Sequence, residues 1–207
     1  KIAIVKALRQ LNDNNSALFL RGIRYLQLEA SYGSAVDTAV EIRCQCAYAL
    51  VDMDDPDVLY ELITLAFDAE RAAQLAAVRA LANSGKHEAE LLLRMLATSR
   101  IGAPEITGEC LHGLMQLAPN PSFDFVAAYL DSPSEQLREA AALALAQTHS
   151  SKAFEALRTR WEASPAFERR LLILPFATLR LTEALDFLLA VVETENEKLA
   201  CEAVSAL

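Results

Sequence analysis

The chain has 207 residues, 53% of them hydrophobic, and a formal net charge of −9 at pH 7. Glycine and proline are scarce, with 6 and 7 residues, which excludes a disordered chain and an all-β domain and predicts an all-α fold. No apolar stretch approaches the roughly 18 residues of a membrane-spanning helix, and the acidic excess repels phosphate, so we expect a cytoplasmic protein that binds neither membrane nor nucleic acid.

Similar segments recur along the chain, and each ends on a large apolar residue that we call the anchor. From Leu50 onward the anchors are separated by 31, 33, 31, 31 and 31 residues. A period of about 31 residues is typical of stacked helical hairpins. The spacing before Leu50 is 42, so an insertion of about eleven residues is expected around Ser31 to Asp37, as a loop. The anchors are Leu8, Leu50, Leu81, Leu114, Leu145, Phe176 and Leu207.

A second helix is expected between successive anchors. One hairpin of this size cannot bury its own apolar faces, so neighbouring hairpins must cover one another. We therefore expect residues 1–207 to form a single solenoid domain that is a fragment of a longer repeat protein, with further repeats beyond Leu207. The expected second helices cover residues 58–67, 88–96, 123–130, 153–161 and 184–192.

Two segments carry a family resemblance, IRCQCAYALVDMDDPDVLYEL at 42–62 and LREAAALALAQTHSSKAFEAL at 137–157. They resemble the short HEAT-like repeats named after phycobilisome lyases. In that family an arginine lies seven residues before the anchor, as Arg43, Arg138 and Arg169 do here. Gln74, Thr107 and Ala200 occupy this position in the other repeats. The resemblance implies a right-handed, armadillo-type superhelix of about six hairpins with a concave binding surface, in a bacterial protein.

The positions nine, five and two residues before each anchor, and two after it, form one stripe along the first helix of a hairpin. We call it the solvent stripe, because it is expected to face water. In the first three helices after the insertion the stripe is polar and predicts a site for a polar ligand, although isolated polar residues often serve solubility alone. The candidate residues for this site are Tyr48, Arg79, Glu109 and His112.

In the next two helices the solvent stripe becomes apolar. A contiguous apolar strip on a wet surface indicates a binding site. We expect it to accept an apolar helix or extended segment of a partner, with Arg169, Arg170 and Arg180 supplying nearby cations. The alternative is that superhelical curvature or missing repeats bury the strip as ordinary core. Its residues are Leu143, Phe167, Leu171 and Leu174.

The ionisable residues are unevenly distributed. Residues 52–90 contain nine acidic and three basic side chains, whereas residues 151–180 contain six basic and three acidic ones. We therefore expect a chain that is electrostatically polar along its length. Trp161 with Arg158 and Arg160 is a basic aromatic cluster of the kind that stacks on bases, but we favour packing of Trp161 between hairpins.

No motif indicates catalysis or a cofactor. The cysteines Cys44, Cys46, Cys110 and Cys201 lack zinc-binding spacing, and we interpret them as reduced, buried core residues. His87-Glu88 is similar to the His-Glu pairs of the HEAT-like deoxyhypusine hydroxylases, but a single pair does not make a metal site. No serine, cysteine or lysine has a base motif beside it, and the glycines form no phosphate loop.

The sequence thus predicts a scaffold that is not an enzyme, has no cofactor or metal, and binds a protein or peptide on its concave face. One alternative, which the repeat resemblance implies, is a phycobilin lyase-like or chromophore-handling accessory protein. A second alternative is a nucleic-acid-binding solenoid. The oligomeric state does not follow from the sequence.

Overall fold

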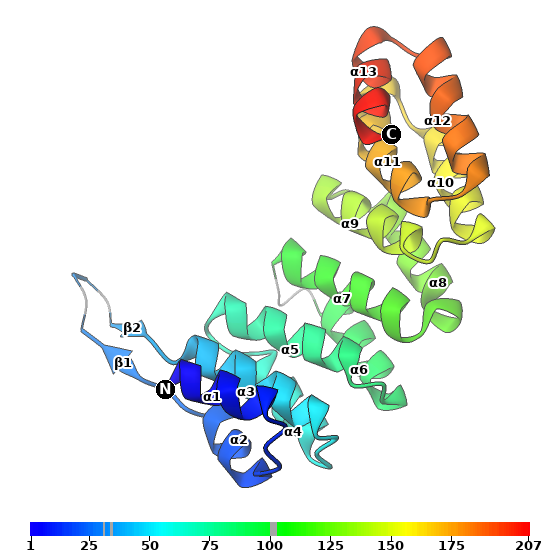
Figure 1. The fold of residues 1–207 in the computed structure, drawn as a ribbon. Helices are drawn as coiled ribbons and strands as arrows, with labels where there is room; N and C mark the ends of the chain where they lie inside the picture. Colours follow the sequence, from blue (N-terminus) through cyan, green and yellow to red (C-terminus); the bar gives the residue numbers. More distant parts are fainter. Residues whose placement is uncertain (31, 34, 100–102) are drawn as a thin grey trace. The chain divides into compact units, whose positions relative to one another are not determined.

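The computed structural model describes residues 1–30, 32–33, 35–99 and 103–207, and in this part of the chain helices predominate (Figure 1). The all-α fold is confirmed. The chain divides into two compact units, Lys1–Leu96 and Ala97–Leu207. The single domain and the handedness of the superhelix stay predictions.

In the first unit, α3 is the central helix and packs against α1, α2 and α5. The helices alternate along the chain as the repeat predicts, and one short strand pair interrupts them. The elements are α1 (Ile2–Gln10), α2 (Ser16–Ile23), β1 (Leu28–Glu29), β2 (Val36–Asp37), α3 (Val40–Asp52), α4 (Val58–Leu65), α5 (Arg71–Asn83) and α6 (His87–Thr98).

In the second unit the first helices of successive hairpins stack in order, α7 on α9, α9 on α11 and α11 on α13. The second helices begin within a few residues of where the sequence predicts them. The elements are α7 (Pro104–Leu117), α8 (Pro119–Ala127), the 3-10 helix η1 (Ala128–Asp131), α9 (Glu135–Ala146), α10 (Ser151–Ala163), α11 (Ala166–Leu179), α12 (Thr182–Thr194) and α13 (Glu197–Ala206).

The anchors form the centre of each stack, which confirms the period. The five inner anchors have a relative exposure of 0%, whereas Leu8 is half-buried and Leu207 is exposed. Full burial of a leucine or phenylalanine side chain stabilises the fold by about 2 kcal/mol. These five positions therefore contribute to the cohesion between hairpins. They are Leu50, Leu81, Leu114, Leu145 and Phe176.

The residue four positions after each anchor from Leu8 to Phe176 has a left-handed backbone conformation, with one exception. The exception is Ala118, four residues after Leu114, which has φ −145. Pro119 follows it, and the residue before a proline is biased toward extended backbone. In the other repeats the chain leaves its first helix through the same turn, so the backbone confirms the register independently of burial. The residues four positions after an anchor with positive φ are Asn12 (φ 51), Asp54 (φ 49), Gly85 (φ 66), His149 (φ 48) and Arg180 (φ 54).

The arginine seven residues before the anchor joins one repeat to the next. Arg138 donates to the carbonyl of Ser132 at 2.8 Å, in the loop before its own helix, and pairs with Glu168 of the following repeat at 3.4 Å. Arg169 does the same with the carbonyl of Ser164 at 3.2 Å and with Glu195 at 2.5 Å. The position favoured by the HEAT-like resemblance is thus a structural link between hairpins.

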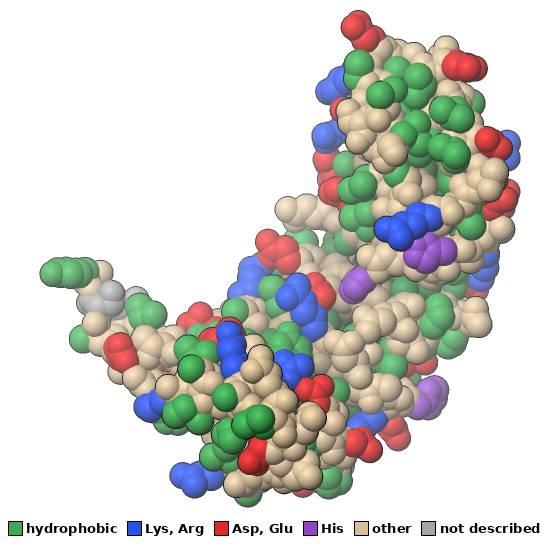
Figure 2. All heavy atoms as spheres, in the orientation of Figure 1, with side chains coloured by type: hydrophobic (Ala, Val, Ile, Leu, Met, Phe, Trp, Pro, Cys, Tyr) green, Lys and Arg blue, Asp and Glu red, His purple; other side chains and the backbone are tan. Residues whose placement is uncertain are grey.

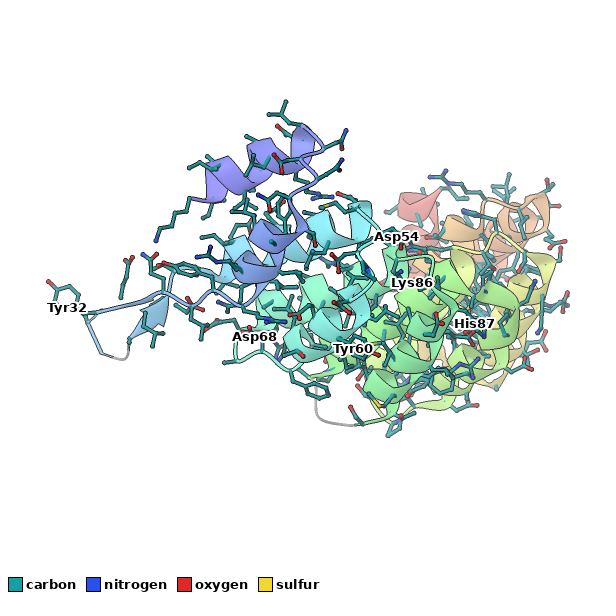
Figure 3. The ribbon with its side chains drawn as sticks, turned by 90° about the horizontal axis from the view of Figure 1, so that it is seen from below. Tyr32, Asp54, Tyr60, Asp68, Lys86 and His87 are labelled. Atoms are coloured by element: carbon teal, nitrogen blue, oxygen red, sulfur yellow. The ribbon has the colours of Figure 1, made fainter. Side chains whose placement is uncertain are left out.

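The insertion is a projecting hairpin, which we call the arm (residues 26–37), where the sequence predicts a loop. Its two strands pair antiparallel, with Leu28 opposite Asp37 and Glu29 opposite Val36. Residues 31 and 34 of the predicted loop lie outside the described residues. Tyr32 lies at the far end of the arm, away from the helices (Figure 3).

Candidate protein-binding groove

The apolar part of the solvent stripe is exposed where it runs along α11. Phe167 has a relative exposure of 74% and Leu174 of 54%, while Leu171 between them is half-buried. The spacing of four and three residues places all three side chains on one face of the helix. Within the described residues, the packing of the repeats therefore leaves Phe167 and Leu174 uncovered.

Two adjoining hollows lie between α11 and α13, and we call them together the α11–α13 groove. The first has a volume of about 410 Å³ and the second of about 390 Å³. Arg170 and Glu202 line both hollows, which are therefore neighbours. The first is lined by Glu135, Ala166, Phe167, Glu168, Arg170, Leu171, Asn196, Lys198, Leu199 and Glu202, and the second by Arg170, Ile173, Leu174, Cys201, Glu202, Ser205 and Ala206.

The wall formed by α11 also contains a backbone acceptor. Pro175 lies inside α11 and is buried. Since proline has no amide hydrogen, it cannot donate to the carbonyl of Leu171, four residues earlier, in the wall of the groove. That carbonyl is thus a hydrogen-bond acceptor that the regular helix pattern does not use.

The sequence also contains the signal for the wall formed by α13, although this wall was not predicted. Lys198, Glu202 and Ser205 lie nine, five and two residues before the anchor Leu207, which are the positions of the solvent stripe. All three line the groove. Applying the stripe rule to the last helix as well would have identified both walls.

The predicted cations differ in their surroundings. Arg170 lies in the groove and pairs with Glu135 at 2.6 Å, both side chains being exposed. The Arg169 guanidinium instead lies 5.3 Å from the centre of the Trp161 ring and pairs with Glu195, so these contacts of Arg169 are made within the fold. Arg180 is exposed at the end of α11, outside the groove lining. A ligand-binding role of Arg169 stays a prediction.

Leu143 and the polar candidates are not brought into this groove. Leu143 is half-buried on α9. In the first unit Tyr48 lies half-buried on α3, with the Arg9 guanidinium 5.2 Å from its ring centre, and Arg79 is exposed on α5. In the second unit Glu109 and His112 are half-buried one turn apart on α7. Their binding role stays a prediction.

The cysteines separate into two kinds, and one prediction about them is wrong. Burial raises the pKa of Cys44 and Cys46 to about 11 and that of Cys110 to about 12, so these thiols are protonated at neutral pH. Cys201 is exposed and lies along the groove, because α13 has no neighbouring helix on that side in the described residues. It was predicted to be buried.

The other candidate sites are structural or solvated. Trp161 is buried in a ring cluster with Phe176 and Phe187, as the packing interpretation predicts, and Arg158 pairs with Glu162. His87 is exposed at the start of α6. Among the described residues, no group of three or more His, Cys, Asp and Glu side chains is placed to hold a metal ion. The same residues include no helix long and apolar enough to cross a membrane.

Comparison with known proteins finds similarity to solved structures and not to other sequences. No protein-family model and no curated protein matches the sequence. The structure is similar to that of the complex of CpcE and CpcF of phycocyanin lyase from Nostoc sp. PCC7120, with 18% identity, a TM-score of 0.48, and coverage of 100% of this chain and 88% of that one. It is also similar to human deoxyhypusine hydroxylase in complex with glycerol, with 14% identity, a TM-score of 0.33, and coverage of 99% and 95%.

The first of these neighbours corrects one prediction. The sequence was expected to encode a protein that is not an enzyme. The similar structure is that of a lyase, a complex of two protein chains, and this finding contradicts the expectation. The error has a physical reason, because a solenoid surface can act on a bound partner without any local catalytic motif in the sequence.

Proposed function

We propose that this chain is a lyase-like, chromophore-handling repeat protein, which binds a partner protein in the α11–α13 groove. The observation that carries the proposal is the exposure of Phe167 and Leu174 beside two adjoining hollows. The repeats resemble those named after phycobilisome lyases, and this resemblance supplies the class of process.

The chemistry of the groove suits a polypeptide. Large apolar residues on α11 form one wall, and the polar residues Lys198, Glu202 and Ser205 on α13 form the other. An amphipathic helix or an extended segment presents both kinds of surface at once. A burial of two exposed aromatic or aliphatic side chains on binding is worth about 3 kcal/mol, which is enough to change an affinity by a factor of about 100.

The test separates partner binding from pigment attachment. A phycocyanin subunit and a free bilin would be incubated with the protein, and pigment retained by the subunit after denaturing electrophoresis would be measured. The groove variant Phe167→Ser/Leu174→Ser is expected to lower the rate of attachment and the affinity for the subunit at least tenfold. Leu91→Ser on α6, which removes a leucine whose exposure of 66% lies between those of Phe167 and Leu174, is the control.

Two outcomes would overturn the proposal. One is the absence of any attached pigment with the unaltered protein when the subunit and the bilin are in excess. The other is equal attachment by the groove variant and the control. Circular dichroism of each variant verifies that it is folded, which is expected because both groove side chains are exposed.

A further inference from the structure

The arm displays apolar side chains that nothing in the described chain covers. Leu26, Leu28, Tyr32 and Val36 are all exposed, and Tyr32 is fully so. Between residues 26 and 36 the only charged residue is Glu29, in a chain with 23% charged residues. The hydrophobic end of the arm is visible in Figure 2. Uncovered apolar surface of this kind indicates a contact with another molecule.

The base of the arm is fixed to the first unit. Arg43 donates to the carbonyl of Tyr25 at 3.0 Å, just before the arm, and pairs with Asp37 at its end. The Asp37 carboxylate also accepts hydrogen bonds from the backbone N–H groups of Gln27 at 3.0 Å and Ala39 at 2.9 Å. An arm held at both ends of its base loses less conformational entropy when it binds.

Each face of the arm carries one large apolar side chain and one carboxylate. Residues that pair across an antiparallel ladder lie on the same face, so Leu28 shares a face with Asp37, and Val36 shares the other with Glu29. A surface that covers both Leu28 and Val36 must therefore contact the arm from two sides. A groove with two walls does this, whereas a flat surface does not.

The α11–α13 groove has these properties. It has two walls, it is apolar along α11, and its two hollows have room for large side chains. It also contains Lys198, for which the described residues provide no ion-pair partner and which could pair with the arm's Glu29. The other charges of the groove are Glu202, the Arg170–Glu135 pair and Glu168, which pairs with Arg138 and Arg160.

From this match we infer that the arm of one copy of the chain binds in the α11–α13 groove of a second copy. The inference rests on the proposed function to the extent that both assign a protein ligand to the groove. It names that ligand as an apolar β-hairpin. Because the arm and the groove are different surfaces, the contact is head to tail.

The experiment uses the fact that two different surfaces, the arm and the groove, meet in this contact. The mass of the full chain would be measured by light scattering after size exclusion, over a range of concentrations. The unaltered protein is expected to rise above the 22.6 kDa of one chain. The arm variant Leu28→Ser/Tyr32→Ser and the groove variant Phe167→Ser/Leu174→Ser should each remain at one chain, with affinity lowered at least tenfold. An equimolar mixture of the two should recover a dimer, because each variant retains the surface that the other lacks.

Charge reversal tests the pairing inside the contact. Lys198→Glu is expected to weaken association, and Glu29→Lys in the same chain should restore it. Tyr60→Ser/Leu91→Ser, which removes exposed apolar residues of α4 and α6, should associate like the unaltered protein. All of these positions are exposed, so the variants are expected to fold.

The possible failures are distinguishable. A mass of one chain at every concentration, association that persists in both variants, or a mixture that fails to form a dimer would each overturn the inference. If the groove variant still lost pigment attachment in such a case, the proposed function would stand. If association behaved as expected but attachment were unaffected, the proposed function would fail and the arm contact would stand.

Discussion

Arg43 and Asp37 form an ion pair at the base of the arm, with the guanidinium Nη1 2.5 Å from the carboxylate Oδ2. Both side chains are buried, at 2% and 6% exposure. The same guanidinium pairs through Nε with Asp68 at 2.9 Å, in the loop before α5. One arginine therefore joins the insertion, its own helix and the next hairpin.

Removing one charge of this cluster should be strongly destabilising. Asp37→Asn is expected to lower the free energy of unfolding by about 3 kcal/mol, because breaking a buried pair leaves a charge without full compensation. Urea denaturation measures the free energy of unfolding of each variant. Asp54→Asn is the control. Asp54 pairs with Lys86 (Figure 3) at 2.7 Å but is highly exposed, so the loss of stability should be below about 1 kcal/mol. Equal losses would contradict the assignment.

The same pair should respond to acid. Burial by itself raises the pKa of Asp37, but the backbone N–H groups of Ala39 and Gln27 and the Arg43 guanidinium together lower it below its usual value. A carboxyl with a lowered pKa in the folded state stabilises the fold above its unfolded pKa of about 3.9, and this contribution is lost as the pH falls through the folded pKa. The difference in stability between the unaltered protein and Asp37→Asn should be constant above pH about 5 and shrink below pH about 4. A difference that grew on acidification would refute this.

The recurring left-handed residue offers a stabilising substitution. Arg180 has φ 54, a conformation that is unfavourable for residues with a Cβ atom and open to glycine. Arg180→Gly should raise the free energy of unfolding by about 0.5 to 1 kcal/mol. His149→Gly should gain less, since the His149 Nδ1 hydrogen bond to the carbonyl of Leu179, 3.0 Å long, is lost. Thermal unfolding compares the two, and a destabilised Arg180→Gly would contradict the strain argument.

Gly22 should tolerate no side chain while Cys46 is present. A Cβ at Gly22 on α2 would overlap with the Cys46 Sγ on α3. In an open helix, alanine in place of glycine stabilises by about 0.5 to 1 kcal/mol, but overpacking here should make Gly22→Ala destabilising by about 1 to 3 kcal/mol. Adding Cys46→Ala removes the sulfur and should recover part of the loss. A double-mutant cycle without coupling would show that the two residues are not in contact.

Thiol reactivity should separate the cysteines. Cys44, Cys46 and Cys110 are buried, and burial raises their pKa to about 11 or 12, whereas Cys201 is exposed. A thiol reagent at pH 8 should therefore modify Cys201 rapidly and the other three only after denaturation. Mass spectrometry of the labelled protein identifies the site. Fast labelling of Cys110 in the native protein would contradict its burial.

The uneven distribution of charge along the chain stays a prediction, but the structure shows how individual charges are paired. The acidic excess of residues 52–90 predicted an electrostatically polar chain. In the folded first unit, many of these acids are paired with bases from neighbouring segments. The pairs are Arg9–Asp52, Arg24–Glu61, Arg43–Asp68, Lys86–Asp54 and Arg94–Glu90. A count along the sequence cannot detect this, because most of the partners come from different helices.

The class of fold, the repeat period and most of the solvent stripe could be predicted from the sequence, although Ala76, five residues before Leu81, is buried. These properties follow from the spacing of apolar residues within a few turns of one helix, and the burial of Leu50, Leu145 and Phe176 agrees with them. Only the folded chain shows which residues of different segments meet, such as Arg43 with Asp37 and Asp68, and that the stripes of α11 and α13 line one groove. Such contacts join residues that are distant in sequence, and their geometry arises only when hairpins pack against one another.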